Sequence, residues 1–261
     1  MPQHSTAYTI GFAAAVCGVC SLFVAGSAVA LKPRQLDNKA IDRQLKVLAV
    51  AGLMEGGEDL SKEQVRERYD QYIQPVVVDL KTGAPASDVD AKSFDQQEAM
   101  ANPASSAKAP ENPAKVQRIP NKGVLFKIVK DGKLDGVIFP VQGKGLWSTM
   151  YGYLALEADG NTVKGITFYE HGETPGLGGE IENPLWQSLW PGRQIYDREG
   201  VPKLQVVKGQ AGSVADDPYA IDGLSGATLT SRGVTGLVQF WLGENGYGPY
   251  VERLRAEKGE I

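Results

Sequence analysis

An uncharged apolar run near the N-terminus is the feature that most constrains the chain. It extends from Tyr8 to Leu31 without an Asp, Glu, Lys or Arg residue. A helix needs about 20 predominantly apolar residues to cross the hydrocarbon core of a membrane, and this run supplies them. The sequence therefore predicts a short tail over residues 1–7 and a single membrane-spanning helix over residues 8–31.

A cleaved signal peptide is the alternative interpretation of this run, because Ala28-Val29-Ala30 is typical of a cleavage site. The run is long for a leader, however, and no Lys or Arg precedes it, which favours a retained anchor. Basic residues follow the run instead, and by the positive-inside rule they would place the rest of the chain in the cytoplasm. They are Lys32, Arg34, Lys39 and Arg43.

The composition excludes several classes of function. The 261 residues carry a formal net charge of −4, whereas proteins that follow nucleic-acid phosphates carry basic stripes, so we expect no nucleic-acid partner. Cys17 and Cys20 are the only cysteines, and both lie in the apolar run. The rest of the chain therefore has no disulfide framework or tetrahedral zinc site. The two cysteines are either inert packing residues or half of a metal site shared with another chain.

Two helices are predicted directly after the anchor. Apolar residues at helical spacing predict the first helix over about residues 38–53, ended by Gly56 and Gly57. Ser61 and Gln64 form the S-x-x-Q pattern of a capping box for a second helix. That helix is expected to run to about residue 73.

A strand and a linker follow these helices. The sequence VVVDL predicts a short strand over residues 76–80. From residue 83 to about 117, Ala, Ser, Pro, Asp, Lys and Gln dominate, which predicts a flexible or extended stretch over the surface of a domain. Residues 32–120 are thus expected to be a helical and linker segment that packs on the soluble domain.

Residues 121–261 show the pattern of an antiparallel sheet with peripheral helices, so the predicted class is α+β. Short runs rich in β-branched and aromatic residues alternate with turn signals such as DGK and DGN. Helices are predicted at Pro184 after an Asn183 cap, over TSRGVTGLVQFWL with Thr230 or Ser231 as the cap, and over GPYVERLRAEKG. The predicted strands are GVLFKIV, GVIFPVQ, YGYLALE, VKGITFY and LQVVKG.

One stretch of this part is rich in small and hydroxyl-bearing residues. It reads DGLSGATLTSRGV from Asp222 to Val234, and it holds no His, Cys or Lys that could activate a nucleophile. Small residues let a backbone approach a ligand closely, and a helix N-terminus presents free N–H groups to an anion. The residues alone predict a phosphate site near residues 225–231, with an ordinary loop and helix cap as the alternative.

The order of residues in Asp222-Gly-Leu-Ser-Gly-Ala-Thr228 resembles the D-x-x-[ST]-G-A-[ST] motif of the FMN-binding domain family. In that family a flavin transferase moves FMN from FAD onto the last hydroxyl of the motif. The resemblance implies FMN joined covalently to Thr228 by a phosphoester, with Asp222 in the sequence that the transferase recognises. A local base is then unnecessary, because the threonine is not activated by its own protein.

Two further stretches resemble the same family: GKGLWSTMYG, which begins at residue 143, and ETPGLG, which begins at residue 173. An isoalloxazine ring needs an apolar, partly aromatic surround with a few polar contacts. Taken alone, Trp147 is more typical of a core residue, and the resemblance is what favours a flavin contact. Besides Thr228, the resemblance implies these cofactor-binding residues: Trp147, Thr174, Leu177, Gly178, Ser225, Gly226 and Ala227.

Over its whole length the chain is most similar to the C-subunit family of sodium-translocating NADH:quinone oxidoreductases. The resemblance implies an electron-carrying subunit with other membrane subunits as partners. It also implies that the soluble domain lies on the periplasmic side of the bacterial inner membrane, which is opposite to the orientation that the basic residues after the anchor predict. No GxGxxG follows a strand to open a helix, so we expect no NADH site in this chain. Two alternatives remain: the G subunit of Rnf-type complexes, which typically lacks so long a segment as residues 32–120, and a membrane-tethered binding module without flavin.

Overall fold

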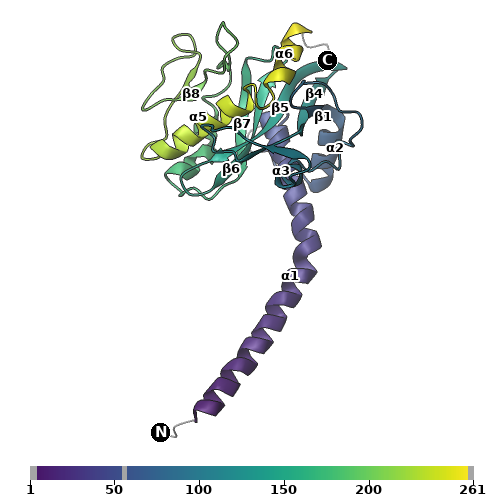
Figure 1. Cartoon of the computed structure of the whole chain (residues 1–261), viewed down its shortest axis with the longest axis vertical. Coiled ribbons are helices and arrows are strands. Elements are labelled where there is room, and N and C mark those ends of the chain that lie inside the picture. Colours follow the sequence, from purple (N-terminus) through teal and green to yellow (C-terminus); the bar gives the residue numbers. More distant parts are fainter. Residues whose placement is uncertain (1–4, 55–57, 258–261) are drawn as a thin grey trace. The chain divides into compact units, whose positions relative to one another are not determined.

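The computed structural model describes residues 5–54 and 58–257, and it divides into two compact units, Met1–Arg43 and Gln44–Ile261 (Figure 1). Helix α1 (Thr6–Val50) is continuous and includes Pro33. The prediction of a separate helix over residues 38–53 is therefore wrong, because these residues continue the helix that contains the apolar run. The helix ends at Val50, ahead of Gly52, which takes a φ of +68°. The predicted stop at residues 56 and 57 lies outside the described residues.

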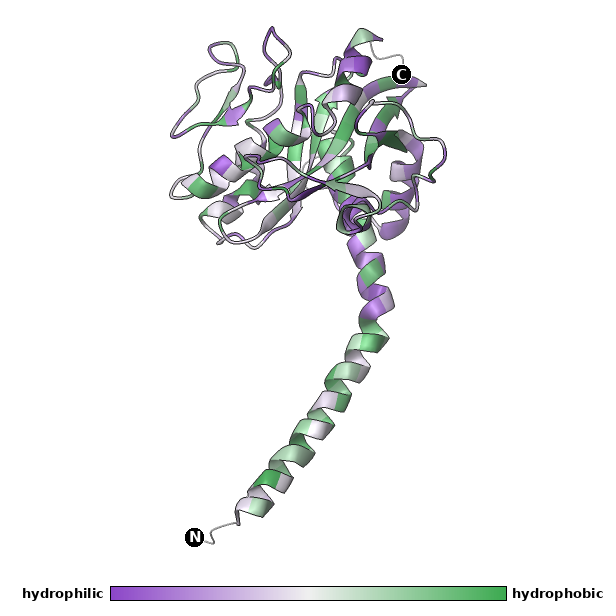
Figure 2. Ribbon diagram, viewed as in Figure 1, coloured by the Kyte–Doolittle hydropathy of each residue, from purple (hydrophilic) through white to green (hydrophobic). Residues whose placement is uncertain are grey.

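The N-terminal part of α1 is long and apolar enough to cross a membrane. Its large apolar side chains are exposed, and Figure 2 shows their concentration along this part of the helix. Cys17 and Cys20 are also exposed on this helix. Within the described ranges, no group of three or more His, Cys, Asp or Glu residues could hold a metal ion. The helix fits a single-pass membrane protein.

The second unit is built on a five-stranded antiparallel sheet with the order β1-β4-β5-β6-β7. The predicted α+β class is confirmed. The DGK turn joins β4 to β5, with Asp131 at φ 51° and Gly132 at φ 73°, the left-handed pair that a tight hairpin requires. The strands are β1 (Ile73–Asp79), β4 (Lys122–Lys130), β5 (Lys133–Lys144), β6 (Thr149–Glu157) and β7 (Val163–Glu170).

Helices α5 (Thr228–Trp241) and α6 (Gly248–Ala256) contribute to the core on one face of this sheet. Alternate strand residues point into that core, among them Phe139, Leu154 and Phe168, all 0% exposed. On the other face, the backbone of Gly165 in β7 lies against Val50 at the end of α1. Helix α2 (Lys62–Tyr72) contacts β1 and β4, and its Ser61–Gln64 capping box is confirmed.

The stretch from residue 83 to 117 was predicted to be flexible or extended, and the structure corrects this. It contains α3 (Gln96–Ala101), whose N-cap Asp95 accepts hydrogen bonds from the backbone N–H groups of residues 97 and 98. It also contains β2 (Ser106–Lys108), which pairs with β3 (Arg118–Pro120). The stretch is ordered because Met100, Ala114 and Val116 are buried in the core. The boundary at residue 120 stays a prediction.

The region between β7 and α5 is made of short elements. Asn183 caps α4 as predicted, and its side chain accepts a hydrogen bond from the N–H of Leu185. The predicted strand LQVVKG shrinks to two residues, which pair in parallel with two residues just before the hydroxyl-rich stretch. The elements are the 3₁₀ helix η1 (Gly178–Glu182), α4 (Pro184–Gln187), β8 (Gln205–Val206) and β9 (Ala220–Ile221).

Candidate functional site

Thr228 is the first residue of α5, and its side chain is exposed. Among the described residues, its hydroxyl has no hydrogen-bond partner. The residue before it, Ala227, is the N-cap and makes no side-chain capping bond. The first N–H groups of a helix have no intrahelical partner, so the hydroxyl of Thr228 stands beside free donors and the positive end of the helix dipole. This arrangement fits a phosphate on Thr228.

The predicted helix caps Thr230 and Ser231 do not cap α5. Both lie inside its first turn and are buried, with 1% and 5% of their surfaces exposed. The hydroxyl of Thr230 donates to Oε2 of Glu173 at 2.5 Å, and Oγ of Ser231 accepts from the N–H of Leu224 at 3.2 Å. The capping prediction is wrong because these hydroxyls serve contacts with residues outside the helix.

The structure brings the hydroxyl-rich stretch and the ETPGLG loop together at Gly226. This glycine has a φ of +70°, and a Cβ atom there would lie 2.9 Å from Cδ2 of Leu177. A larger residue would strain that backbone conformation and would displace the end of the Leu177 side chain. Ser225 and Gly226 are exposed, whereas Ala227 is 5% exposed. The loop itself is held by the carbonyl of Thr174, which accepts from the N–H groups of Leu177 and Gly179.

A third stretch, residues 145–148, is tied to the same place by Glu173. Oε1 of Glu173 accepts from the N–H groups of Trp147 at 2.9 Å and Ser148 at 3.3 Å. Oε2 accepts from the N–H of Leu146 at 3.1 Å, in addition to the hydroxyl of Thr230. We call this carboxylate and its four donors the Glu173 clamp. The sequence did not single out Glu173 as a site residue, because its contacts are with residues 25 to 57 positions away.

The carboxyl of Glu173 is ionised despite its burial. Only 5% of the residue is exposed, and this burial opposes ionisation. The hydroxyl of Thr230 and the N–H groups of residues 146–148 outweigh it and hold the pKa of the Glu173 carboxyl below its usual range. A buried charge with several donors is a rigid junction, because moving any donor leaves part of the charge without compensation.

Large apolar side chains are exposed beside this junction. Trp147 is 66% exposed, Leu146 44%, Leu177 44% and Leu229, the residue after Thr228, 54%. The interpretation of Trp147 as a core residue is therefore wrong. Apolar side chains left on the surface around one point are typical of a binding site, and a planar aromatic ring would cover them.

Asp222 is half-buried and holds a neighbouring loop. Its Oδ1 accepts from the N–H of Ala211 at 2.8 Å, and its carbonyl accepts from the indole N–H of Trp186 at 2.9 Å. Asp222 thus fixes the start of the hydroxyl-rich stretch relative to α4 and to the loop before β9. Its second carboxylate oxygen has no hydrogen bond to the described residues.

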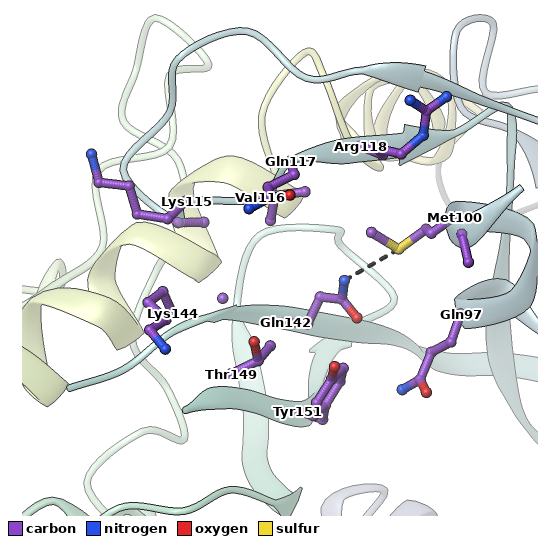
Figure 3. Close-up of a pocket in the computed structure, with 13 residues that line it drawn as sticks. Gln97, Met100, Lys115, Val116, Gln117, Arg118, Gln142, Lys144, Thr149 and Tyr151 are labelled. Carbon is purple, nitrogen blue, oxygen red and sulfur yellow. Dashed lines mark hydrogen bonds between the residues drawn. The ribbon is translucent and has the colours of Figure 1, made fainter. Parts of the chain in front are cut away.

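A cavity of about 600 Å³ lies between β5, β6 and residues 114–118. None of the predicted site residues lines it. Figure 3 shows Gln142 and Met100 pointing toward each other across it, with Nε2 of Gln142 donating to Sδ of Met100 at 3.2 Å. The guanidinium of Arg118 and the amine of Lys115 point away from Gln142 (Figure 3). Lys144, which lines the cavity, donates from Nζ to the carbonyl of Trp147 at 3.2 Å, so the cavity adjoins the stretch of residues 145–148.

Comparisons with known proteins agree with these features. Residues 145–243 match the model of the FMN-binding domain family. The chain is 46% identical over 261 residues to the C subunit of the Na(+)-translocating NADH-quinone reductase of Pseudomonas aeruginosa, covering 99% of this chain and 98% of that protein. It is 45% identical to the corresponding C subunit of Vibrio anguillarum, covering 91% and 90%.

Two solved structures are also similar. The crystal structure of Shewanella oneidensis NqrC matches with a TM-score of 0.76 and 38% identity, covering 84% of this chain and 99% of that one. The crystal structure of the C subunit of the Na(+)-translocating NADH-quinone reductase from Parabacteroides distasonis matches with a TM-score of 0.64 and 27% identity, covering 85% and 96%.

Proposed function

Because this chain belongs to the C-subunit family of Na⁺-translocating NADH-quinone reductases, we propose that it carries FMN on the hydroxyl of Thr228 through a phosphoester bond. As a member of the family it is an FMN-carrying subunit of a redox-driven translocase. The position of Thr228 in the fold is the observation that supports a covalent link. Its hydroxyl is exposed, makes no hydrogen bond to the described residues, and stands at the first position of α5, next to free backbone donors.

The attachment needs an external enzyme, because the stretch around Thr228 holds no His, Cys or Lys that could act as a base. A flavin transferase supplies FAD. A bond would form between Oγ1 of Thr228 and the FMN phosphorus as the bond between the two phosphates of FAD breaks, and AMP would leave with the bridging oxygen and the proton that the hydroxyl gives up. The exposure of Thr228 gives the transferase access, and the small residues Ser225 and Gly226 leave room beside it.

The exposed apolar side chains around the Glu173 clamp form the surround for the ring. Trp147 and Leu177 supply exposed apolar surface, Thr174 is exposed in the same loop, and Gly178 is buried against Glu173 and Thr230. FMN, when bound, accepts and releases electrons one or two at a time. The protein holds it in place between turnovers, since a covalent cofactor cannot dissociate.

The other membrane subunits of the complex are the electron donor and acceptor partners. α1 anchors the chain in the inner membrane, with the flavin domain on the periplasmic side. Basic residues after the span argue for the opposite orientation, but large domains cross membranes despite flanking charge.

The direct test is the fluorescence of the full-length protein after denaturing electrophoresis. Made together with a flavin transferase, the protein should give a band that fluoresces under ultraviolet light. Made without the transferase, the same band should be dark. A dark band in both preparations would contradict the proposal.

Changing Asp222 should remove flavin attachment. We expect Asp222→Ala and Asp222→Asn each to lose most of the covalent FMN, because the transferase recognises the carboxylate. Asp222→Asn keeps an oxygen that can accept from the N–H of Ala211, so its thermal stability should match the wild type, whereas Asp222→Ala loses that bond, at a cost of about 1 kcal/mol. In-gel fluorescence and thermal melts measure both effects. Normal flavin content in Asp222→Asn would show that Asp222 acts only by holding the loop.

A charge at Leu177 should shift the flavin's reduction potential while leaving the covalent link intact. We expect Leu177→Lys to raise the potential, because a positive charge beside the ring stabilises the reduced anion. At about 8 Å and an effective dielectric constant near 20 the interaction is roughly 2 kcal/mol, or about 40 mV for a two-electron couple. Since Leu177 is 44% exposed, screening makes this an upper value.

Spectroscopic titration of the flavinylated protein measures this shift, and Leu177→Met is the neutral control. An unchanged spectrum and potential in fully flavinylated Leu177→Lys would mean that the ETPGLG loop lies away from the ring.

A further inference from the structure

The Glu173 clamp joins three segments that are far apart in the chain. Glu173 begins the ETPGLG loop, its backbone donors come from residues 146–148, and its side-chain donor, Thr230, lies in the first turn of α5. Thr230 follows Thr228 by two residues. One buried carboxylate therefore connects the exposed Trp147 and the loop of Leu177 to the turn that displays the acceptor hydroxyl.

All four groups that hydrogen-bond to this carboxylate are donors, so the clamp requires the side chain at position 173 to be an ionised acid. Three are backbone N–H groups, which can only donate. A glutamine in place of Glu173 would keep the shape, but its amide NH₂ would face at least one of these N–H groups. A neutral isostere therefore cannot reproduce the contacts without a shift of residues 146–148.

Two glycines pack closely against the clamp. A Cβ atom on Gly145 would lie 2.5 Å from Oε1 of Glu173, and one on Gly178 would lie 2.5 Å from Oγ1 of Thr230. The backbones at Gly145 and Gly178 therefore lie too close to the carboxylate and to Thr230 for a larger residue, while α5 reaches the carboxylate through the side chain of Thr230. Loss of the clamp would move the segments against one another rather than be absorbed locally.

We propose that Glu173 is a positioning residue for the flavin: through its clamp it fixes Trp147 and Leu177 relative to the first turn of α5, and so sets the orientation and the exposure of the ring attached to Thr228. This role rests on the proposed function. Glu173 acts through the side chains and backbone that it holds, since it is itself 5% exposed. The low pKa of its carboxyl agrees with this role, because the clamp requires the ionised form.

The first test measures the clamp in the full-length, flavin-free protein by amide hydrogen exchange. In Glu173→Gln the N–H groups of residues 146–148 should exchange at least about tenfold faster than in the wild type, as expected when a hydrogen bond to a charged acceptor is lost. Glu157→Gln is the control. Glu157 lies at the end of β6 and forms an ion pair with Lys164, so this variant also removes one carboxylate charge. It should leave the exchange rates of the N–H groups of residues 146–148 unchanged.

The second test measures the ring in the flavinylated full-length protein. In Glu173→Gln, covalent FMN should remain at wild-type content, because Thr228 is intact. Quenching of the flavin fluorescence by iodide should rise, and the reduction potential should shift. The change in quenching and the shift in potential should both be seen well below the melting temperature of the variant. If Glu173 only stabilised the fold, the substitution would lower the melting temperature and change neither.

A second pair of variants keeps the proposal testable if Glu173→Gln fails to fold. Thr230→Val removes the hydroxyl donor and keeps the side-chain volume, so it should change the quenching in the same direction. Thr230→Ser keeps the hydroxyl and should behave as the wild type. The positioning role alone would be overturned if flavinylated Glu173→Gln and Thr230→Val both had the iodide quenching and the reduction potential of the flavinylated wild type. A wild-type chain without flavin would overturn the proposed function itself.

Discussion

Thr228→Ala should carry no covalent FMN at all. When it is made with a flavin transferase, its band should be dark after denaturing electrophoresis while the wild-type band fluoresces. The variant should fold normally, because Thr228 is exposed, its hydroxyl makes no hydrogen bond to the described residues, and alanine is favourable at the start of a helix. Thermal melts of the flavin-free proteins check the fold.

Thr228→Ser is the matched control for this prediction. It restores an acceptor hydroxyl at the same position and should recover the fluorescent band. A fluorescent Thr228→Ala band would contradict the assignment of the acceptor. The neighbouring hydroxyls would then be tested, and of these Ser225 is exposed whereas Thr230 is buried in the Glu173 clamp.

Removal of residues 1–32 should move the protein completely from the membrane fraction to the supernatant. Within the described residues, α1 is the one helix long and apolar enough to cross a membrane, and the truncation removes its apolar part. The remaining residues of α1 include Val47, Leu48 and Val50, which are buried and stay attached to the sheet unit. We therefore expect a soluble, monomeric protein that still accepts FMN on Thr228.

Ultracentrifugation after cell lysis measures this distribution, and in-gel fluorescence measures the flavin. A variant that lacks only residues 1–7 retains the apolar run and should remain in the membrane pellet. If the protein without residues 1–32 also pelleted with membranes, a second membrane-attachment surface would have to exist.

The sheet could be predicted from the sequence because its signals are local. Each central strand is a short run of β-branched and aromatic residues, and the DGK turn carries residues that tolerate left-handed backbone. The capping box at Ser61 and the cap at Asn183 are also local patterns, and both were confirmed. The motif around Thr228 was found in the same way, as a run of seven adjacent residues.

The features that were missed depend on contacts between distant residues. The order of residues 83–117 comes from the burial of Met100, Ala114 and Val116 in a core formed by other segments. Thr230 matched the pattern of a helix cap, but its partner Glu173 lies 57 positions earlier. Trp147 matched the composition of a core, but the clamp holds its loop at the surface. Such pairings are not encoded in any short stretch, and only the folded chain shows them.

The mass of the intact protein, followed by peptide mapping, tests the covalent link most directly. Full-length protein made with a flavin transferase should be heavier than the bare chain by one FMN less one water, and the added mass should lie on the peptide that contains Thr228. An unmodified mass, or FMN located on a peptide without Thr228, would contradict the account.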